Sequence, residues 1–191
     1  MINIWDGTPD PELPQTDDEL LQYYNNKYGS PTKNDLENGE NSCFTNTSSG
    51  YYYEAENAII SDGVIIYDDV NASNGAAISY FQDGRFMEYT ITSNIDTEVL
   101  LILSGSKYEQ GKYAISSLMT VTYQFENQEK QKMIPSAIPF SPIGNSWNAY
   151  KEFIGGEINL HKGINTIRIT STNIPVNYDY ICLVKPLSNN V

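Results

Sequence analysis

Beyond residue 50, short runs of alternating apolar and polar residues follow one another, and turn-forming residues separate them. The clearest run, RFMEYTIT (85–92), places Met87, Tyr89 and Ile91 on one face. Side chains alternate across a strand, so this pattern predicts strands with one buried face. The predicted strands are YYYEAENA, GVIIYD, AAISYF, RFMEYTIT, EVLLILSG, LMTVTYQFE, KMIPSAIPF, NAYKEFI, EINL, NTIRITST and DYICLVK. Many short strands without helices between them predict an all-β fold, an antiparallel β-sandwich or barrel.

One helix is predicted before the strands, over residues 17–28. Thr16 can cap its N-terminus, and Glu19, three residues later, completes a capping box. Gly29 is a stop signal. An apolar stripe recurs at helical spacing, at Leu20, Tyr24 and Tyr28. This helix either docks on the strands or belongs to a neighbouring segment.

Polar flanks set the domain boundaries. Residues 1–15 are rich in Pro and Asp, and residues 32–50 are rich in Asn, Ser, Thr and Gly. Such composition is typical of linkers and surface loops. We therefore expect an N-terminal linker or appendage over residues 1–50, a β-domain over residues 51–187 and a tail over residues 188–191.

Composition and charge narrow the classes of partner. The chain has 191 residues, of which 40% are hydrophobic, enough for one domain with a core. Its net charge of -13 argues against a nucleic-acid partner, because phosphate binding needs clustered Lys and Arg. No apolar run approaches the length of a membrane span. The N-terminus lacks the features of a signal peptide, which leaves a cytoplasmic protein or a piece of a larger secreted one.

Catalytic motifs are missing from the sequence. It contains no G-x-S-x-G, H-E-x-x-H, P-loop or G-x-G-x-x-G pattern. His161 is the single histidine, and it lies in a predicted turn with no nucleophile motif pointing to it. The 24 acidic residues leave a paired-carboxylate glycosidase mechanism open by count alone. We expect a protein that is not an enzyme.

The two cysteines, Cys43 and Cys182, lie far apart in the sequence and match no metal-site spacing. The sequence leaves open whether they pair. Cys182 lies inside the apolar segment YICLV, which favours a buried free thiol.

Three carboxylates form a candidate metal site. On one continuous strand, Glu54 and Glu56 would point to the same face, where their like charges repel. In the last predicted strand, Asp179 shares a face with Ile181 and Leu183, and a lone buried charge there is costly. The first and last strands of compact domains often lie close together, so a calcium ion could sit among the three acids. Alternatively, the glutamates are solvated and Asp179 caps a turn.

Five segments, in order, carry a family pattern: YEAEN (53–57), NGAAISYFQDGRFMEYTI (74–91), IGNSWNAY (143–150), INLHKGINTIRI (158–169) and NYDYICL (177–183). With this order and spacing, residues 53 to about 185 resemble carbohydrate-binding modules of families 6 and 35. The resemblance implies a jelly-roll β-sandwich without catalytic activity. It also implies attachment of a larger secreted carbohydrate-active protein, such as a glycoside hydrolase, to a polysaccharide or oligosaccharide.

The resemblance assigns roles to individual residues. It implies a structural calcium ion, held by the glutamates of an E-x-E motif and the aspartate of an N-x-D-Y-I motif; here these are Glu54, Glu56 and Asp179. It implies a sugar site made of two aromatic residues and an asparagine; here these are Tyr80, Trp147 and Asn177, with Phe81 and Tyr178 as neighbours that could contribute. Aromatic rings stack on the apolar faces of a pyranose, and an amide hydrogen-bonds its hydroxyls.

The sequence also departs from the family pattern. Tyr150 replaces the second tryptophan of T-G-x-W-x-x-W, which we interpret as a packing change. The loop from Gly144 to Trp147 is one residue longer, and the predicted hairpin at 118–140 is extended. These changes leave open which sugar is bound. They also leave open whether the module binds the ends or the interiors of polysaccharide chains.

The resemblance also predicts the oligomeric state, the location and the partners of the protein. It implies a monomeric module, cut from a secreted multimodular protein without its signal peptide, with no nucleic-acid or membrane partner. The alternative is a structural or adhesion β-sandwich with a protein partner, for which the predicted helix and the 118–140 hairpin would form the interface.

Overall fold

The computed structural model describes residues 16–29 and 50–187. The helical elements are α1 (Asp17–Tyr28), the 3-10 turn η1 (Ala55–Asn57) and the short α4 (Ile115–Leu118). The strands are β1 (Gly50–Glu54), β2 (Ile59–Ile60), β3 (Ile65–Asp68), β4 (Ala76–Phe81), β5 (Phe86–Ser93), β6 (Thr97–Ser106), β7 (Met119–Phe125), β8 (Gln131–Lys132), β9 (Lys151–Leu160), β10 (Gly163–Ser171) and β11 (Val176–Val184). Within the described residues, no helix has the length and apolar character of a membrane span.

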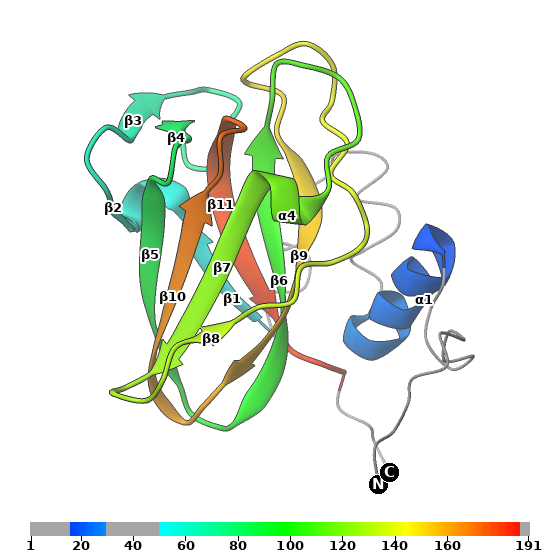
Figure 1. Cartoon of the computed structure of the whole chain (residues 1–191), viewed down its shortest axis with the longest axis vertical. Helices are drawn as coiled ribbons and strands as arrows, with labels where there is room; N and C mark the ends of the chain where they lie inside the picture. The colour runs from blue at the N-terminus through cyan, green and yellow to red at the C-terminus, as the bar shows by residue number, and fades with distance from the viewer. Residues whose placement is uncertain (1–15, 30–49, 188–191) are drawn as a thin grey trace, which may run out of the picture.

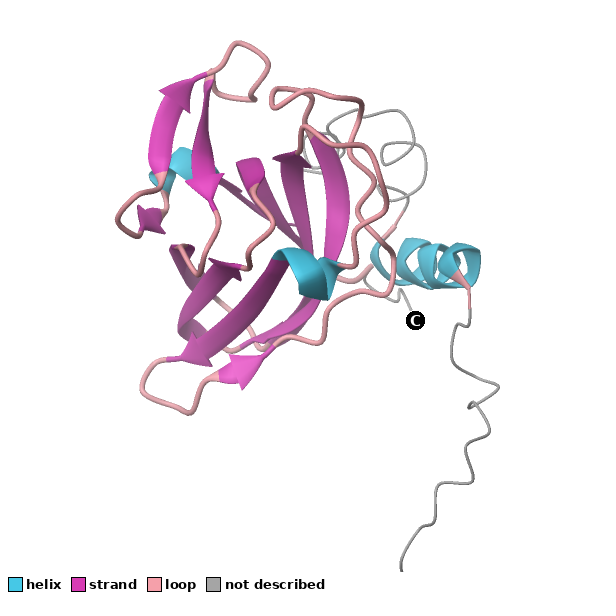
Figure 2. Cartoon of the chain, turned by 45° about the horizontal axis from the view of Figure 1, so that its top comes forward, coloured by secondary structure: helices cyan, strands magenta, loops and turns pink. Residues whose placement is uncertain are grey.

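Two antiparallel sheets packed face to face form the main body (Figures 1 and 2). The first sheet has the order β3-β4-β11-β6-β9, with β1 also paired to β11, and the second has the order β2-β5-β10-β7-β8. Apolar side chains from both sheets fill the space between them. The all-β sandwich expected from the alternating pattern is confirmed.

Strand β11 is buried along its whole length because both of its faces are covered. Its pairing with β6 shifts between Tyr178 and Tyr180, which marks a bulge at Asp179. Tyr178 therefore joins Ile181 in the core between the sheets, whereas Cys182 packs on the opposite face. Strict alternation along this strand would place Tyr178 and Cys182 on the same face, but alternation fails at the bulge.

The first predicted strand is also shorter than expected. Strand β1 ends at Glu54, and the chain then turns through η1, where the Ala58 N–H donates to the Ala55 carbonyl. Ala55 is fully buried, and the turn carries the chain from the first sheet to β2 in the second. Glu54 and Glu56 consequently do not lie on one strand face, contrary to the prediction.

Two further predictions fail around residues 132–160. The segments NAYKEFI and EINL belong to one strand, β9, because the glycine pair between them continues the pairing with a bulge. Gly156 has φ +150, and a Cβ there would lie 2.4 Å from the Ile134 carbonyl oxygen. The expected strand over 132–140 is mostly a loop, since Pro135 and Pro139 lack the N–H that a ladder requires.

Helix α1 has the predicted bounds and the predicted capping box between Thr16 and Glu19. It lies beside the sandwich in Figure 1, and its buried Tyr24 and Tyr28 pack on the outer face of the first sheet. That face is formed by Leu100, Ile102, Ile154, Tyr180, Cys182 and Val184.

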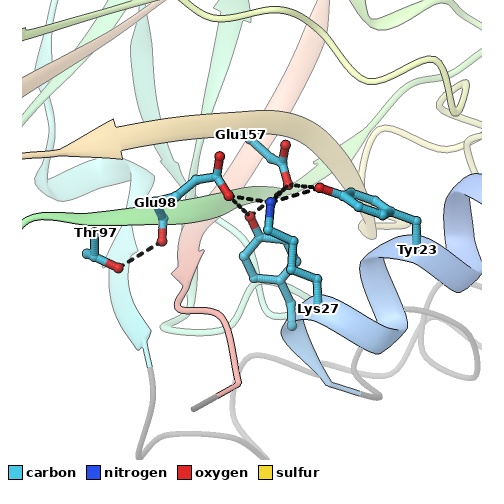
Figure 3. Close-up of polar contacts among 6 residues, drawn as sticks. Tyr23, Lys27, Thr97, Glu98 and Glu157 are labelled. Atoms are coloured by element: carbon cyan, nitrogen blue, oxygen red, sulfur yellow. Dashed lines mark hydrogen bonds and ion pairs between the residues drawn. The ribbon is translucent and has the colours of Figure 1, made fainter. Parts of the chain in front are cut away.

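Polar side-chain contacts also hold the helix against the sheet. Lys27 pairs with Glu98 of β6 and Glu157 of β9, as Figure 3 shows. The Tyr28 hydroxyl oxygen lies 2.8 Å from Glu157 Oε1 and 3.1 Å from Glu98 Oε1, so its single proton is donated to one of these two carboxylates. Of the two alternatives for the helix, docking on the strands is therefore confirmed.

Cys182 is buried at 4% exposure and is disulfide-bonded. The expectation of a free thiol is therefore wrong. Cys43 lies outside the described residues, as do most of the predicted N-terminal appendage and the tail at 188–191.

Candidate functional site

An open pocket of about 390 Å³ lies where β3, β4 and the start of β11 meet the loop before β9. Its lining residues are Tyr67, Ser79, Tyr80, Gln82, Trp147, Asn148, Pro175 and Asn177. The structure thus brings Tyr80, Trp147 and Asn177 into one pocket, although they are 30 or more positions apart in sequence. Their role in binding sugar stays a prediction.

Tyr80 is presented to solvent by an unusual backbone conformation. Its φ is +57, a left-handed conformation that non-glycine residues seldom adopt, and its side chain is 60% exposed. The Arg85 guanidinium donates to the Tyr80 carbonyl at 2.6 Å and holds the turn. Strained residues of this kind concentrate at ligand sites.

Trp147 is held from several sides. The Ser106 hydroxyl and the Asn177 amide both donate to its main-chain carbonyl. Its ring stacks on that of Tyr108, with centroids 6.2 Å apart and an interplanar angle of 28°. The Lys107 ammonium lies 6.0 Å from the ring centroid. These contacts give a preformed aromatic surface, which lowers the entropy cost of binding.

A buried carboxylate underlies the pocket. Asp69, only 3% exposed, accepts hydrogen bonds at Oδ2 from Tyr150 and Asn148, each at 2.8 Å, and from Tyr67 at 3.2 Å. Burial alone would raise the pKa of Asp69, but the bonds from the Asn71 N–H and these side chains hold its pKa below the ordinary value. Asp69 therefore carries its charge inside a ring of donors.

Sequence reasoning missed this network. No motif singles out Asp69 or Tyr67, and their partners Asn148 and Tyr150 are about 80 positions away in sequence. Tyr150, which we interpreted as a packing residue, is a hydrogen-bond donor to Asp69. The two neighbours that could contribute, Phe81 and Tyr178, are not among the lining residues, because both are buried in the core.

Of the three predicted metal ligands, Glu54 and Asp179 converge on one hydroxyl. Ser73 Oγ lies 2.7 Å from Glu54 Oε2 and 2.8 Å from Asp179 Oδ1. A hydroxyl carries one proton and cannot donate to both carboxylates at once. Glu56 accepts from Asn74 at Oε1, while its buried Oε2 has no hydrogen-bond partner among the described residues.

The environment of Asp179 and Glu54 disfavours their charged forms. Burial raises the pKa of Asp179 to about 6, and the nearby Glu54 charge adds to the rise. Burial also raises the pKa of Glu54, with a contribution from Glu56. Among the described residues, none of the three forms an ion pair with Lys, Arg or His.

The three side chains are not gathered around a single point. Across residues 16–29 and 50–187, no three His, Cys, Asp or Glu side chains are arranged to hold a metal ion as they stand. What the structure does provide is two carboxylates, Glu54 and Asp179, that converge on the Ser73 hydroxyl, and an unpaired oxygen on the neighbouring Glu56. This donor chemistry fits a hard cation; the calcium ion itself stays a prediction.

Solved structures with the same fold include carbohydrate-binding modules. A family 35 module from Clostridium thermocellum is 21% identical, with a TM-score of 0.55, and the match covers 71% of this chain and 98% of that one. The C-terminal CBM6 of a marine laminarinase from Zobellia galactanivorans is 17% identical, with a TM-score of 0.52, over 71% of this chain and 99% of that one. The chain has the fold of a family 6 or family 35 carbohydrate-binding module.

The same fold occurs as part of a larger enzyme. The GH26-CBM35 β-(1,4)-mannanase of Podospora anserina is 21% identical, with a TM-score of 0.55, and the match covers 75% of this chain but only 29% of the mannanase. No family model matches the sequence, and no curated protein does. The family 6/35 resemblance of the five sequence segments is thus confirmed at the level of the fold.

Proposed function

We propose that this chain is a non-catalytic carbohydrate-binding module that attaches a larger secreted protein to a polysaccharide or oligosaccharide. The observation that carries the proposal is the single pocket lined by Tyr80, Trp147 and Asn177. An exposed aromatic pair beside an amide suits the alternating apolar faces and hydroxyl edges of a sugar ring.

Binding without hydrolysis is supported by the lining of the pocket. Glycoside hydrolysis ordinarily needs two carboxyl groups flanking the scissile bond. No aspartate or glutamate lines this pocket, and Asp69 beneath it is buried and fully engaged by donors.

The attachment role is supported by the Podospora mannanase, in which a module of this fold makes up part of a longer chain. On this proposal the module is a secreted monomer within a multimodular protein, without nucleic-acid or membrane partners. The net charge of -13 suits such a role, because it opposes binding to phosphate.

We also propose a structural calcium ion held by Glu54, Glu56 and Asp179. The buried unpaired oxygen of Glu56 and the convergence of Glu54 and Asp179 on Ser73 support it. When bound, the ion would neutralise the carboxylates and tie β1 to β11. It takes no part in the proposed sugar contacts.

A glycan panel tests the function directly. The purified chain is applied to an array of neutral and acidic polysaccharides, and we expect saturable binding to at least one of them without release of reducing sugar. Binding to no glycan, together with capture of a specific protein ligand, would replace this proposal with the structural or adhesion alternative. Release of reducing sugar would identify an enzyme instead.

A further inference from the structure

The pocket lining carries no charged side chain. Its eight residues are all uncharged at neutral pH. The cations nearby do not line the pocket: Arg85 donates to the Tyr80 carbonyl, and Lys107 pairs with Glu109 at 3.2 Å. The charge directly beneath the pocket is the buried carboxylate of Asp69. A ligand with a carboxylate would therefore meet no cationic side chain in the lining itself.

Asp69 also fixes the orientation of Asn148. An ionised carboxylate only accepts hydrogen bonds, so Asn148 must turn its Nδ2 toward Asp69, at 2.8 Å. The amide oxygen of Asn148 then points away from Asp69. In the part of the chain that the structure describes, no donor to this oxygen is recorded, so it remains an acceptor for a ligand.

Asn177 is oriented in the same sense. Its Nδ2 lies 3.3 Å from the Trp147 carbonyl, which only accepts, and 3.2 Å from the Tyr67 hydroxyl. Its amide oxygen, for which no donor is recorded among residues 16–29 and 50–187, is the second fixed acceptor.

The tyrosine hydroxyls complete the pattern. The Tyr150 hydroxyl donates to Asp69, the Tyr67 hydroxyl lies 2.6 Å from that of Tyr150, and Asn177 donates to Tyr67. The hydrogen bonds of this network are therefore directed toward the Asp69 carboxylate. The other polar lining groups, on Ser79, Tyr80 and Gln82, can present a donor or an acceptor and do not discriminate.

We propose that this pocket selects uncharged sugars, which it recognises as hydroxyl donors, and rejects sugars that carry a carboxylate. The inference rests on the proposed function and names the substrate class of that site. A sugar hydroxyl can donate to the Asn148 and Asn177 oxygens, whereas a carboxylate only accepts. When an amide oxygen of the pocket faces a carboxylate oxygen of the ligand, neither receives a hydrogen bond in the complex. This unfavourable contact weakens binding of the acidic ligand.

Matched ligands test the inference. Each neutral polysaccharide that the chain binds is compared with the same polymer oxidised at C6 to the uronic acid, by equilibrium titration. We expect at least about tenfold weaker binding of the oxidised form, the effect of one unsatisfied polar group. Equal or tighter binding of the oxidised form overturns the inference and leaves the proposed function standing. Binding to neither form, nor to any other glycan, overturns both.

A titration at high salt separates the effect of the net charge of the chain on binding from the effect of the pocket. At about 1 M salt the Debye length is about 3 Å, so repulsion from the net charge is screened. We expect the discrimination to persist there. Its disappearance would assign it to the overall charge and overturn the inference.

A pair of variants locates the discrimination at Asp69. Asp69→Asn offers Asn148 a donor, so the amide of Asn148 can turn over, and we expect the neutral-to-acidic ratio to fall at least about threefold. Asp68→Asn removes the same charge at an exposed neighbouring position, and we expect no change. Equal ratios in Asp69→Asn and wild type, with both folded by circular dichroism, would contradict the role of Asp69. The wild-type titration decides the inference even if Asp69→Asn does not fold.

Discussion

Trp147 depends on residues that do not line the pocket themselves. Tyr108 stacks on its ring, Lys107 lies over it, and Ser106 binds its carbonyl. Ser106 is the last residue of β6, and Lys107 and Tyr108 follow it directly, so the end of this strand positions the tryptophan. Truncating one of them changes binding without removing a surface that touches the ligand.

At the residue scale we therefore predict that Tyr108→Ala weakens glycan binding. Aromatic pairs contribute about 0.5–1.5 kcal/mol, so the dissociation constant should rise roughly 3- to 10-fold through loss of order at Trp147. Isothermal titration measures the effect. The control, Ile95→Ala, shortens an apolar side chain of similar exposure far from the pocket and should leave binding unchanged. Unaltered binding in Tyr108→Ala would show that Trp147 needs no such support.

Sequence reasoning could reach Tyr80, Trp147 and Asn177 because each lies inside a recognisable local motif. Asp69 could not be found in that way. Its importance comes from Asn148 and Tyr150, which are 79 and 81 positions away and meet it only after folding. The amides of Asn148 and Asn177 are likewise oriented by groups that only accept hydrogen bonds, and these groups meet them only in the folded chain.

Strands and turns follow the sequence pattern except where backbone geometry overrides it. The glycine pair at 155–156 was expected to make a turn, yet β9 runs through it with a bulge. The bulge at Asp179 similarly moves Tyr178 into the core. Alternation alone does not predict a bulge, because the extra residue is required by neighbouring strands rather than by its own segment.

At the element scale, Gly156→Ala should be strongly destabilising. The new Cβ would lie 2.4 Å from the Ile134 carbonyl oxygen, at a positive φ, so backbone must move. We expect a loss of at least about 2 kcal/mol in the free energy of unfolding, measured by urea denaturation. Gly144→Ala, with φ +65 but open space around it, should cost only about 1 kcal/mol. Equal costs at the two positions would contradict the close approach at Gly156.

Helix α1 gives a second prediction at this scale, because it packs on the sheet. Tyr28 is 1% exposed and bonded to Glu98 and Glu157, so Tyr28→Ala should lower the free energy of unfolding by about 3 kcal/mol. Gln22→Ala, on the exposed side of the same helix, is the matched control. Denaturation curves that coincide for Tyr28→Ala and wild type would mean that α1 contributes nothing to the folded unit.

For the molecule as a whole, function and stability are assigned to different places. The pocket proposed to bind sugar is built on β3, β4, β11 and the loop before β9. The acidic group of Glu54, Glu56 and Asp179 instead lies at the junction of β1, η1 and β11. Glu54, Glu56 and Asp179 are thus proposed to stabilise the sandwich, whereas uncharged side chains of the pocket are proposed to bind the sugar.

Calcium should therefore raise the melting temperature of the chain. Binding to the folded state alone stabilises it by about 2.7 kcal/mol at a hundred times the dissociation constant. Calorimetry in calcium and in chelator measures the difference. Glu54→Gln should reduce the calcium response, whereas Glu129→Gln, at an exposed and unrelated position, should retain it. A wild-type protein that melts at one temperature in both conditions would refute the ion.

The central claim is that the pocket around Trp147 binds carbohydrate. Its most direct test is a titration of wild type and Trp147→Ala with the polysaccharide that binds best in the panel. We predict that Trp147→Ala weakens binding by about 30-fold or more, the loss of roughly 2 kcal/mol typical of a central tryptophan, with an unchanged circular dichroism spectrum. Equal binding by the two proteins would contradict the account and place any sugar site elsewhere on the molecule.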